Sequence, residues 1–67
     1  MAITVKAARL CAGLTQQDIA NMLKIHVQTY ANLEKHPEKF TIAQAEKFAE
    51  CVKQELSDII FLTIKSN

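Results

Sequence analysis

Four side chains belong to the types that most often bind metals or act as nucleophiles, namely Cys11, His26, His36 and Cys51. The cysteines lie 40 positions apart without a CxxC pair, and closer ligand spacing would be needed for a zinc site with the two histidines. The sequence also offers no Gly-rich phosphate loop and no plausible catalytic triad. We therefore expect no enzyme, no metal and no cofactor. The cysteines are interpreted as small thiols in a reducing cytoplasm.

The composition is typical of one small globular domain. The chain has 67 residues, 49% of them hydrophobic and 22% charged, with a single glycine and a single proline. So few turn-forming residues disfavour an all-β fold and favour helices. No apolar stretch approaches the roughly 20 residues that a membrane span requires, and residues 1–5 lack the features of a secretory signal. A single all-α domain over residues 1–67, located in the cytoplasm, is the expectation.

The charge balance is weakly informative about partners. The net charge is +1, with five basic and three acidic side chains in residues 1–40 and three basic and four acidic ones in residues 41–67. A phosphate-binding face in the N-terminal part is compatible with this distribution but is not required by it.

Capping residues and apolar periodicity divide the chain into five predicted helices. Thr4 can cap the first helix, and Gly13 suits its left-handed end. The stretches TQQD, from Thr15, and TIAQ, from Thr41, are capping boxes that open the second and fourth helices. Pro37 ends the third helix, and residues 63–67 are predicted to be a frayed, flexible tail. The five predicted helices span residues 5–12, 15–23, 27–35, 41–53 and 55–61.

The segment from Leu14 to Glu34, LTQQDIANMLKIHVQTYANLE, resembles the helix-turn-helix of the phage repressor/Cro (Xre-type) family. The resemblance implies a five-helix DNA-binding domain over roughly residues 3–61, with the helix-turn-helix at about 16–35. Gln16 matches the glutamine that opens the family's motif, and Ala20 matches the small residue that lets the two helices approach each other. Ile25 matches the apolar residue of the turn, and Tyr30 matches the one that holds the recognition helix. Leu33 and Glu34 close the motif.

Two positions of the turn depart from the family pattern. Lys24 stands where the family usually has glycine, at a turn position that tends toward positive φ, which costs a residue other than glycine about 1 kcal/mol. His26 stands where the family often has serine or threonine as the cap of the recognition helix, and histidine is a poorer cap.

The resemblance implies that the helix over residues 27–35 enters the major groove, with base contacts from Val27, Gln28, Thr29 and Asn32. The amides of Gln28 and Asn32 can each bind adenine through two hydrogen bonds, and Val27 and Thr29 can place methyl groups on thymine. No arginine lies on this face for guanine, so we expect a preference for A·T pairs. The alternative is that these side chains are only solvated surface residues.

Phosphate contacts are expected on both sides of that helix. Thr15, Gln16 and Gln17 lie at the N-terminus of the second helix, where free N–H groups and the helix dipole favour an anion. In the family the residue matching Gln16 contacts phosphate and braces the recognition helix. Lys35 and Lys39 flank the loop after the recognition helix, although they are also compatible with ordinary solvated charges.

The family resemblance implies an ion pair between Arg9 and Glu34 that ties the first helix to the recognition helix. The sequence gives a separate reason to look for it, because both residues adjoin core positions and should lie at the margin of the interior. A guanidinium can bind a carboxylate through two parallel hydrogen bonds, which fixes orientation as well as distance.

The favoured function is therefore a sequence-specific regulator of transcription, Cro- or repressor-like, that binds double-stranded DNA as a homodimer. No membrane association and no small-molecule ligand are expected. Phe61, Leu62 and Ile64 exceed what so small a core can absorb, and either form a two-fold contact or fold back onto the core. The alternative function is a protein-interaction module, an antitoxin or adaptor, on the same scaffold.

Overall fold

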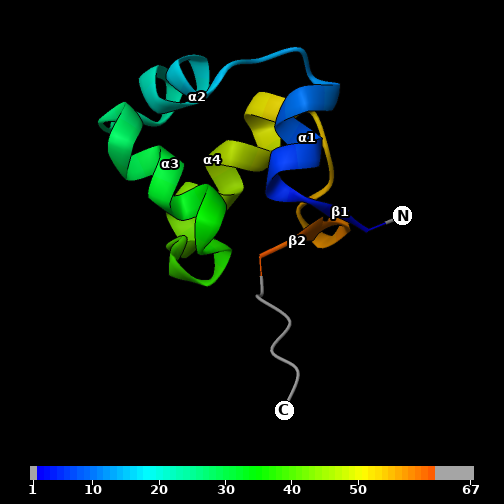
Figure 1. The fold of residues 1–67 in the computed structure, drawn as a ribbon. Helices are drawn as coiled ribbons and strands as arrows, with labels where there is room; N and C mark the ends of the chain where they lie inside the picture. Colours follow the sequence, from blue (N-terminus) through cyan, green and yellow to red (C-terminus); the bar gives the residue numbers. More distant parts are fainter. Residues whose placement is uncertain (1, 62–67) are drawn as a thin grey trace.

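The computed structural model describes residues 2–61, which are mainly helical (Figure 1). Within these residues the α-helices are α1 (Val5–Cys11), α2 (Gln16–Leu23), α3 (Val27–Lys35) and α4 (Ile42–Val52). Two short 3-10 helices, η1 (Pro37–Lys39) and η2 (Leu56–Asp58), and two short strands, β1 (Ile3–Thr4) and β2 (Ile59–Ile60), complete the described chain.

The starts of the helices follow the predicted caps. The hydroxyl of Thr15 accepts the backbone N–H of Asp18 at 3.0 Å, and the carboxylate of Asp18 accepts the N–H of Thr15 at 2.9 Å. The hydrogen bond from the Thr15 backbone also lowers the pKa of Asp18. Thr41 and Gln44 form the same reciprocal pair at the start of α4, and Thr4 caps α1. Both predicted capping boxes are confirmed.

The predicted fifth helix over residues 55–61 is wrong. Only η2 is helical there, and the following residues are extended and pair in parallel with β1, with Ile3 opposite Ile59 and Thr4 opposite Ile60. Two adjacent β-branched residues favour an extended backbone, and the pairing buries Ile59 to 6% exposure. The described chain therefore has four α-helices and a small two-stranded sheet in place of the all-α five-helix arrangement. The predicted tail at 63–67 lies outside the described residues.

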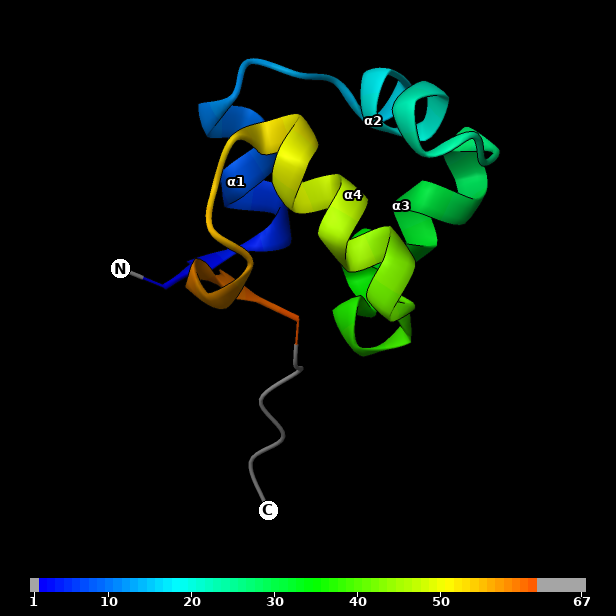
Figure 2. The ribbon, with the colours of Figure 1, turned by 180° about the vertical axis from the view of Figure 1, so that it is seen from behind.

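Helix α4 runs through the middle of the molecule, with α1 on one side and α3 on the other in both views (Figures 1 and 2). The side chain of Phe48, in α4, is fully buried and lies among the rings of Tyr30, Phe40 and Phe61. This aromatic cluster joins α3, the loop after η1 and the end of the described chain to one core. The buried core residues are Val5, Ala8, Ile19, Ala20, Tyr30, Phe48, Ala49, Val52 and Ile59.

The thiol of Cys11 is exposed, and Cys51 is half-buried, which raises its pKa. Among residues 2–61 no cluster of three or more His, Cys, Asp or Glu side chains could hold a metal ion. None of the helices in this part of the chain has the length and apolar character needed to cross a membrane.

Candidate nucleic-acid interface

The turn between α2 and α3 consists of Lys24, Ile25 and His26. Lys24 ends α2 in the left-handed conformation, with φ 60°, as expected for a position where the family usually has glycine. The next N–H, of Ile25, donates to the carbonyl of Ala20 at 3.0 Å, and the Ile25 side chain packs against the core. Helix α2 therefore ends with a left-handed residue followed by an N–H that bonds back to the last turn. Glycine usually occupies the left-handed position in this type of helix end, and Lys24 occupies it here.

His26 caps the recognition helix α3. Its Nδ1 accepts the backbone N–H of Gln28 at 3.1 Å, which satisfies one of the free donors at the start of the helix. The hydroxyl cap usual in the family is therefore replaced by a ring nitrogen, while the start of α3 at Val27 agrees with the prediction.

Helix α3 has one face in the core and another in solvent. Tyr30 and Leu33 are buried, whereas Gln28, Thr29 and Asn32 are exposed. The fourth predicted base-contacting residue, Val27, is half-buried and packs against the core, so little of its side chain is available. The three exposed side chains therefore present two amides and a hydroxyl to solvent, while the opposite face of α3 packs against the core.

The residues predicted to contact phosphate lie in different environments. Thr15 and Gln17 are exposed, and Gln17 donates through its amide to Asn21 Oδ1 at 3.0 Å. Lys35, in the last turn of α3, and Lys39, in η1, are also exposed. Gln16 is half-buried, and its amide donates to the carboxylate of Glu34.

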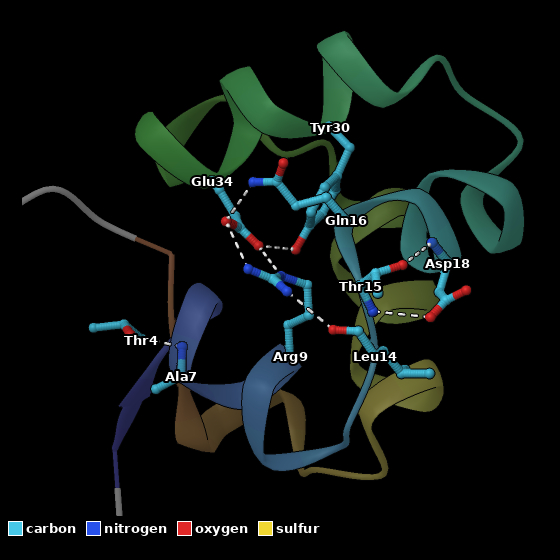
Figure 3. A network of polar contacts seen from close by, with 9 residues as sticks. All are labelled: Thr4, Ala7, Arg9, Leu14, Thr15, Gln16, Asp18, Tyr30 and Glu34. Atoms are coloured by element: carbon cyan, nitrogen blue, oxygen red, sulfur yellow. Dashed lines mark hydrogen bonds and ion pairs between the residues drawn. The ribbon is translucent and has the colours of Figure 1, made fainter.

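Arg9 and Glu34 lie against each other at the junction of α1, α2 and α3 (Figure 3). Arg9 Nε donates to Glu34 Oε2, and Arg9 Nη2 donates to Oε1 at 3.5 Å. A third bond, from Arg9 Nη1 to the carbonyl of Leu14 at 2.9 Å, reaches the loop before α2. The two side chains are 9% and 6% exposed, so the pair is nearly shielded from water.

Two further donors complete the coordination of the Glu34 carboxylate (Figure 3). The Tyr30 hydroxyl donates to Oε2 at 2.8 Å, and the Gln16 amide donates to Oε1 at 3.0 Å. The sequence pattern placed Tyr30 only in the core, whereas for Gln16 the family resemblance implied a brace to the recognition helix besides a phosphate contact. The i, i+4 spacing of Tyr30 and Glu34 on α3 was the available signal for the first contact. The second joins residues 18 positions apart and had no local signal.

Burial and hydrogen bonding act in opposite directions on the charges of this network. Burial would raise the pKa of Glu34, but hydrogen bonds from Arg9, Gln16 and Tyr30 outweigh it and lower the pKa. The hydrogen bond to Glu34 raises the pKa of Arg9 against the effect of burial. Burial, together with the neighbouring carboxylate, raises the pKa of Tyr30 strongly, which keeps its hydroxyl protonated. The network therefore contains one permanent cation, one carboxylate and two neutral donors.

A helix pair with this turn, capped at both starts and with a polar face on its second helix, defines a helix-turn-helix domain. The sequence matches the profile of the helix-turn-helix family over residues 5–59, and the chain belongs to this family, of the Xre/Cro/CI type. Its members are DNA-binding regulators of transcription. Comparison with curated proteins and with solved structures gave no match.

Proposed function

We propose that the protein is a sequence-specific, Cro- or repressor-like regulator that reads the major groove with α3. The observation that carries the proposal is the division of α3 into two faces. Gln28, Thr29 and Asn32 are exposed, while Tyr30 and Glu34 hold the helix to the core and to α1. A reading helix needs this combination of free base-contacting groups and a fixed orientation.

The exposed side chains favour A·T pairs. Gln28 and Asn32 are four positions apart and therefore lie on the same side of α3, where each amide can form two hydrogen bonds with adenine. Thr29 can hydrogen-bond to a base or contact a thymine methyl group. Exposed Lys35 and Lys39, with Gln17 in the first turn of α2, are the proposed contacts to phosphate.

Substitution of Gln28 tests the role of this face. Gln28→Ala is expected to lose about 1–3 kcal/mol on the preferred duplex, selected from a random pool, and to bind random DNA as before, because base contacts carry sequence information. Lys35→Ala is the control: it should weaken binding to all sequences and reduce the slope of log K against log salt by roughly one. Equal losses on both duplexes for Gln28→Ala would assign this side chain to the DNA backbone.

The proposal includes binding as a symmetric homodimer, since one recognition helix reads only a few base pairs and paired half-sites lie about 34–36 Å apart. An apolar groove of ≈ 280 Å³ lies beyond the end of α3, lined in part by Phe40, Leu56 and Phe61. Ile42 also lines this groove; Ile42 is 79% exposed and Leu56 is 40% exposed. In a two-fold contact the same surface of both protomers is used, so the exposed Ile42 of each protomer could enter the groove of the other.

Phe61 contributes to this patch only in part. Its ring centre lies 5.0 Å from that of Phe40 and 6.3 Å from that of Phe48, so Phe61 folds back onto the core. Leu62 and Ile64, the other residues expected at a two-fold contact, lie outside the described residues.

Ile42→Glu tests the dimer without disturbing α4, because an acidic residue in the first turn of a helix is favourable. Loss of one buried isoleucine per protomer removes about 1.5–3 kcal/mol, so affinity for a duplex with two half-sites should fall more than about tenfold. Leu10→Glu, at another exposed apolar residue (57%), has the same charge and should bind as the parent protein. Sedimentation and titration of one- and two-half-site duplexes provide the measurement. An unchanged two-to-one complex with Ile42→Glu would exclude this surface.

A further inference from the structure

His26 has a ring nitrogen that the cap does not use. The residue directly precedes α3, its side chain is exposed, and its Nδ1 accepts the N–H of Gln28 at 3.1 Å. A serine or threonine cap carries a single oxygen on a short side chain. An imidazole carries a second nitrogen, Nε2, on the opposite side of a rigid ring, so it can form the cap and a second hydrogen bond at the same time.

The cap determines which nitrogen of His26 carries the proton. A nitrogen that accepts a hydrogen bond must be unprotonated, so the neutral ring has its hydrogen on Nε2. If Nδ1 also carried a proton, it would be a donor and could not accept the N–H of Gln28, so the cap would be lost. The capped state therefore has a neutral ring with an N–H donor at Nε2, the nitrogen that the cap does not use.

This donor stands at the end of α3 that carries Gln28. Base edges in the major groove are flanked by phosphates, and protein donors beside a recognition helix most often bind phosphate oxygens. We infer that His26 is a DNA-contacting residue, in which Nε2–H donates to a phosphate oxygen next to the base pair read by Gln28 while Nδ1 caps the helix. The inference rests on the proposed function and adds a residue that couples the start of the helix to its position on DNA.

The sharpest test replaces one hydrogen atom. The 67-residue chain, prepared by chemical synthesis with Nε2-methylhistidine at position 26, retains Nδ1 as an acceptor and loses only the Nε2–H donor. We expect unchanged urea unfolding and an affinity about tenfold lower on every duplex, because a hydrogen bond to a charged group is lost. The salt slope should stay the same, because the neutral ring displaces no additional counterions.

His26→Asn supplies the rescue. Asparagine is a good cap, since its oxygen can accept the N–H of Gln28 while its NH₂ group remains available as a donor. This variant should bind within about twofold of the parent. Long-range proton–nitrogen NMR of the free protein at pH 8 should show the His26 proton on Nε2.

Three results would overturn the inference while the parent protein still binds DNA. They are full affinity of the methylated protein, a loss confined to the preferred duplex, which indicates a base contact, or a proton on Nδ1 of His26. Failure of the parent protein to bind any duplex would instead contradict the proposed function. Titration of the unmodified chain in the same experiment therefore distinguishes failure of the inference from failure of the proposed function.

Discussion

Phe48→Ala is expected to leave the chain largely unfolded at 25 °C. The Phe48 side chain is fully buried, with ring centres of Tyr30 and Phe40 at 6.3 and 5.6 Å. Removal of a buried phenyl ring loses its transfer free energy and leaves a cavity, together about 3–5 kcal/mol. Below about 70–80 residues a single hydrophobic core rarely supplies more than about 3–5 kcal/mol of stability, so this loss removes most or all of it. Circular dichroism during urea and thermal unfolding provides the measurement.

Phe40→Ala is the matched control. Phe40 belongs to the same aromatic cluster but is only half-buried, so the same truncation removes less buried area and leaves a site open to water. We expect a loss well below that of Phe48→Ala. Similar losses for the two variants would contradict the assignment of Phe48 as the centre of the core.

The features predicted correctly from local sequence patterns are those set by local hydrogen bonds, whereas the Arg9–Glu34 contact was expected from the family resemblance. The capping boxes at Thr15 and Thr41 fix the starts of α2 and α4 because each needs only residues three positions apart. The left-handed conformation of Lys24 is the one that the family resemblance implied for this position of the turn. In these cases the groups that satisfy the helix ends lie within the same few residues, so a single sequence contains the whole interaction.

The features that local sequence patterns do not reveal depend on partners distant in the chain. Ile59 and Ile60 fit a helical stripe as well as a strand, and the choice is made by pairing with Ile3 and Thr4, which no local pattern reveals. For Gln16 only the family resemblance implied a brace to the recognition helix, and the amide of Gln16 donates to Glu34 on that helix. That contact exists because α1 and α3 place the Arg9–Glu34 pair beside the start of α2, and the sequence around Gln16 does not specify this placement.

Loss of either partner of the Arg9–Glu34 pair should cost about 3–5 kcal/mol, because the remaining charge is left almost buried without its counter-ion. In Arg9→Ala the Glu34 carboxylate keeps only the neutral donors Tyr30 and Gln16. In Glu34→Ala the guanidinium keeps the carbonyl of Leu14. The double variant removes both charges and should cost less than the sum of the single variants.

Urea unfolding of the two single variants and the double variant gives the coupling energy of the pair directly. Glu46→Ala is the control, since Glu46 is an exposed carboxylate on α4, and substitution of such a surface residue usually changes stability by less than about 0.5 kcal/mol. Glu34→Gln, titrated with DNA under conditions where it remains folded, should bind all duplexes more weakly, because α3 loses its fixed orientation relative to α1. A coupling energy below about 0.5 kcal/mol would mean that the pair does not act as a unit. Parent-like DNA affinity of folded Glu34→Gln would show that the network stabilises the domain without positioning the recognition helix.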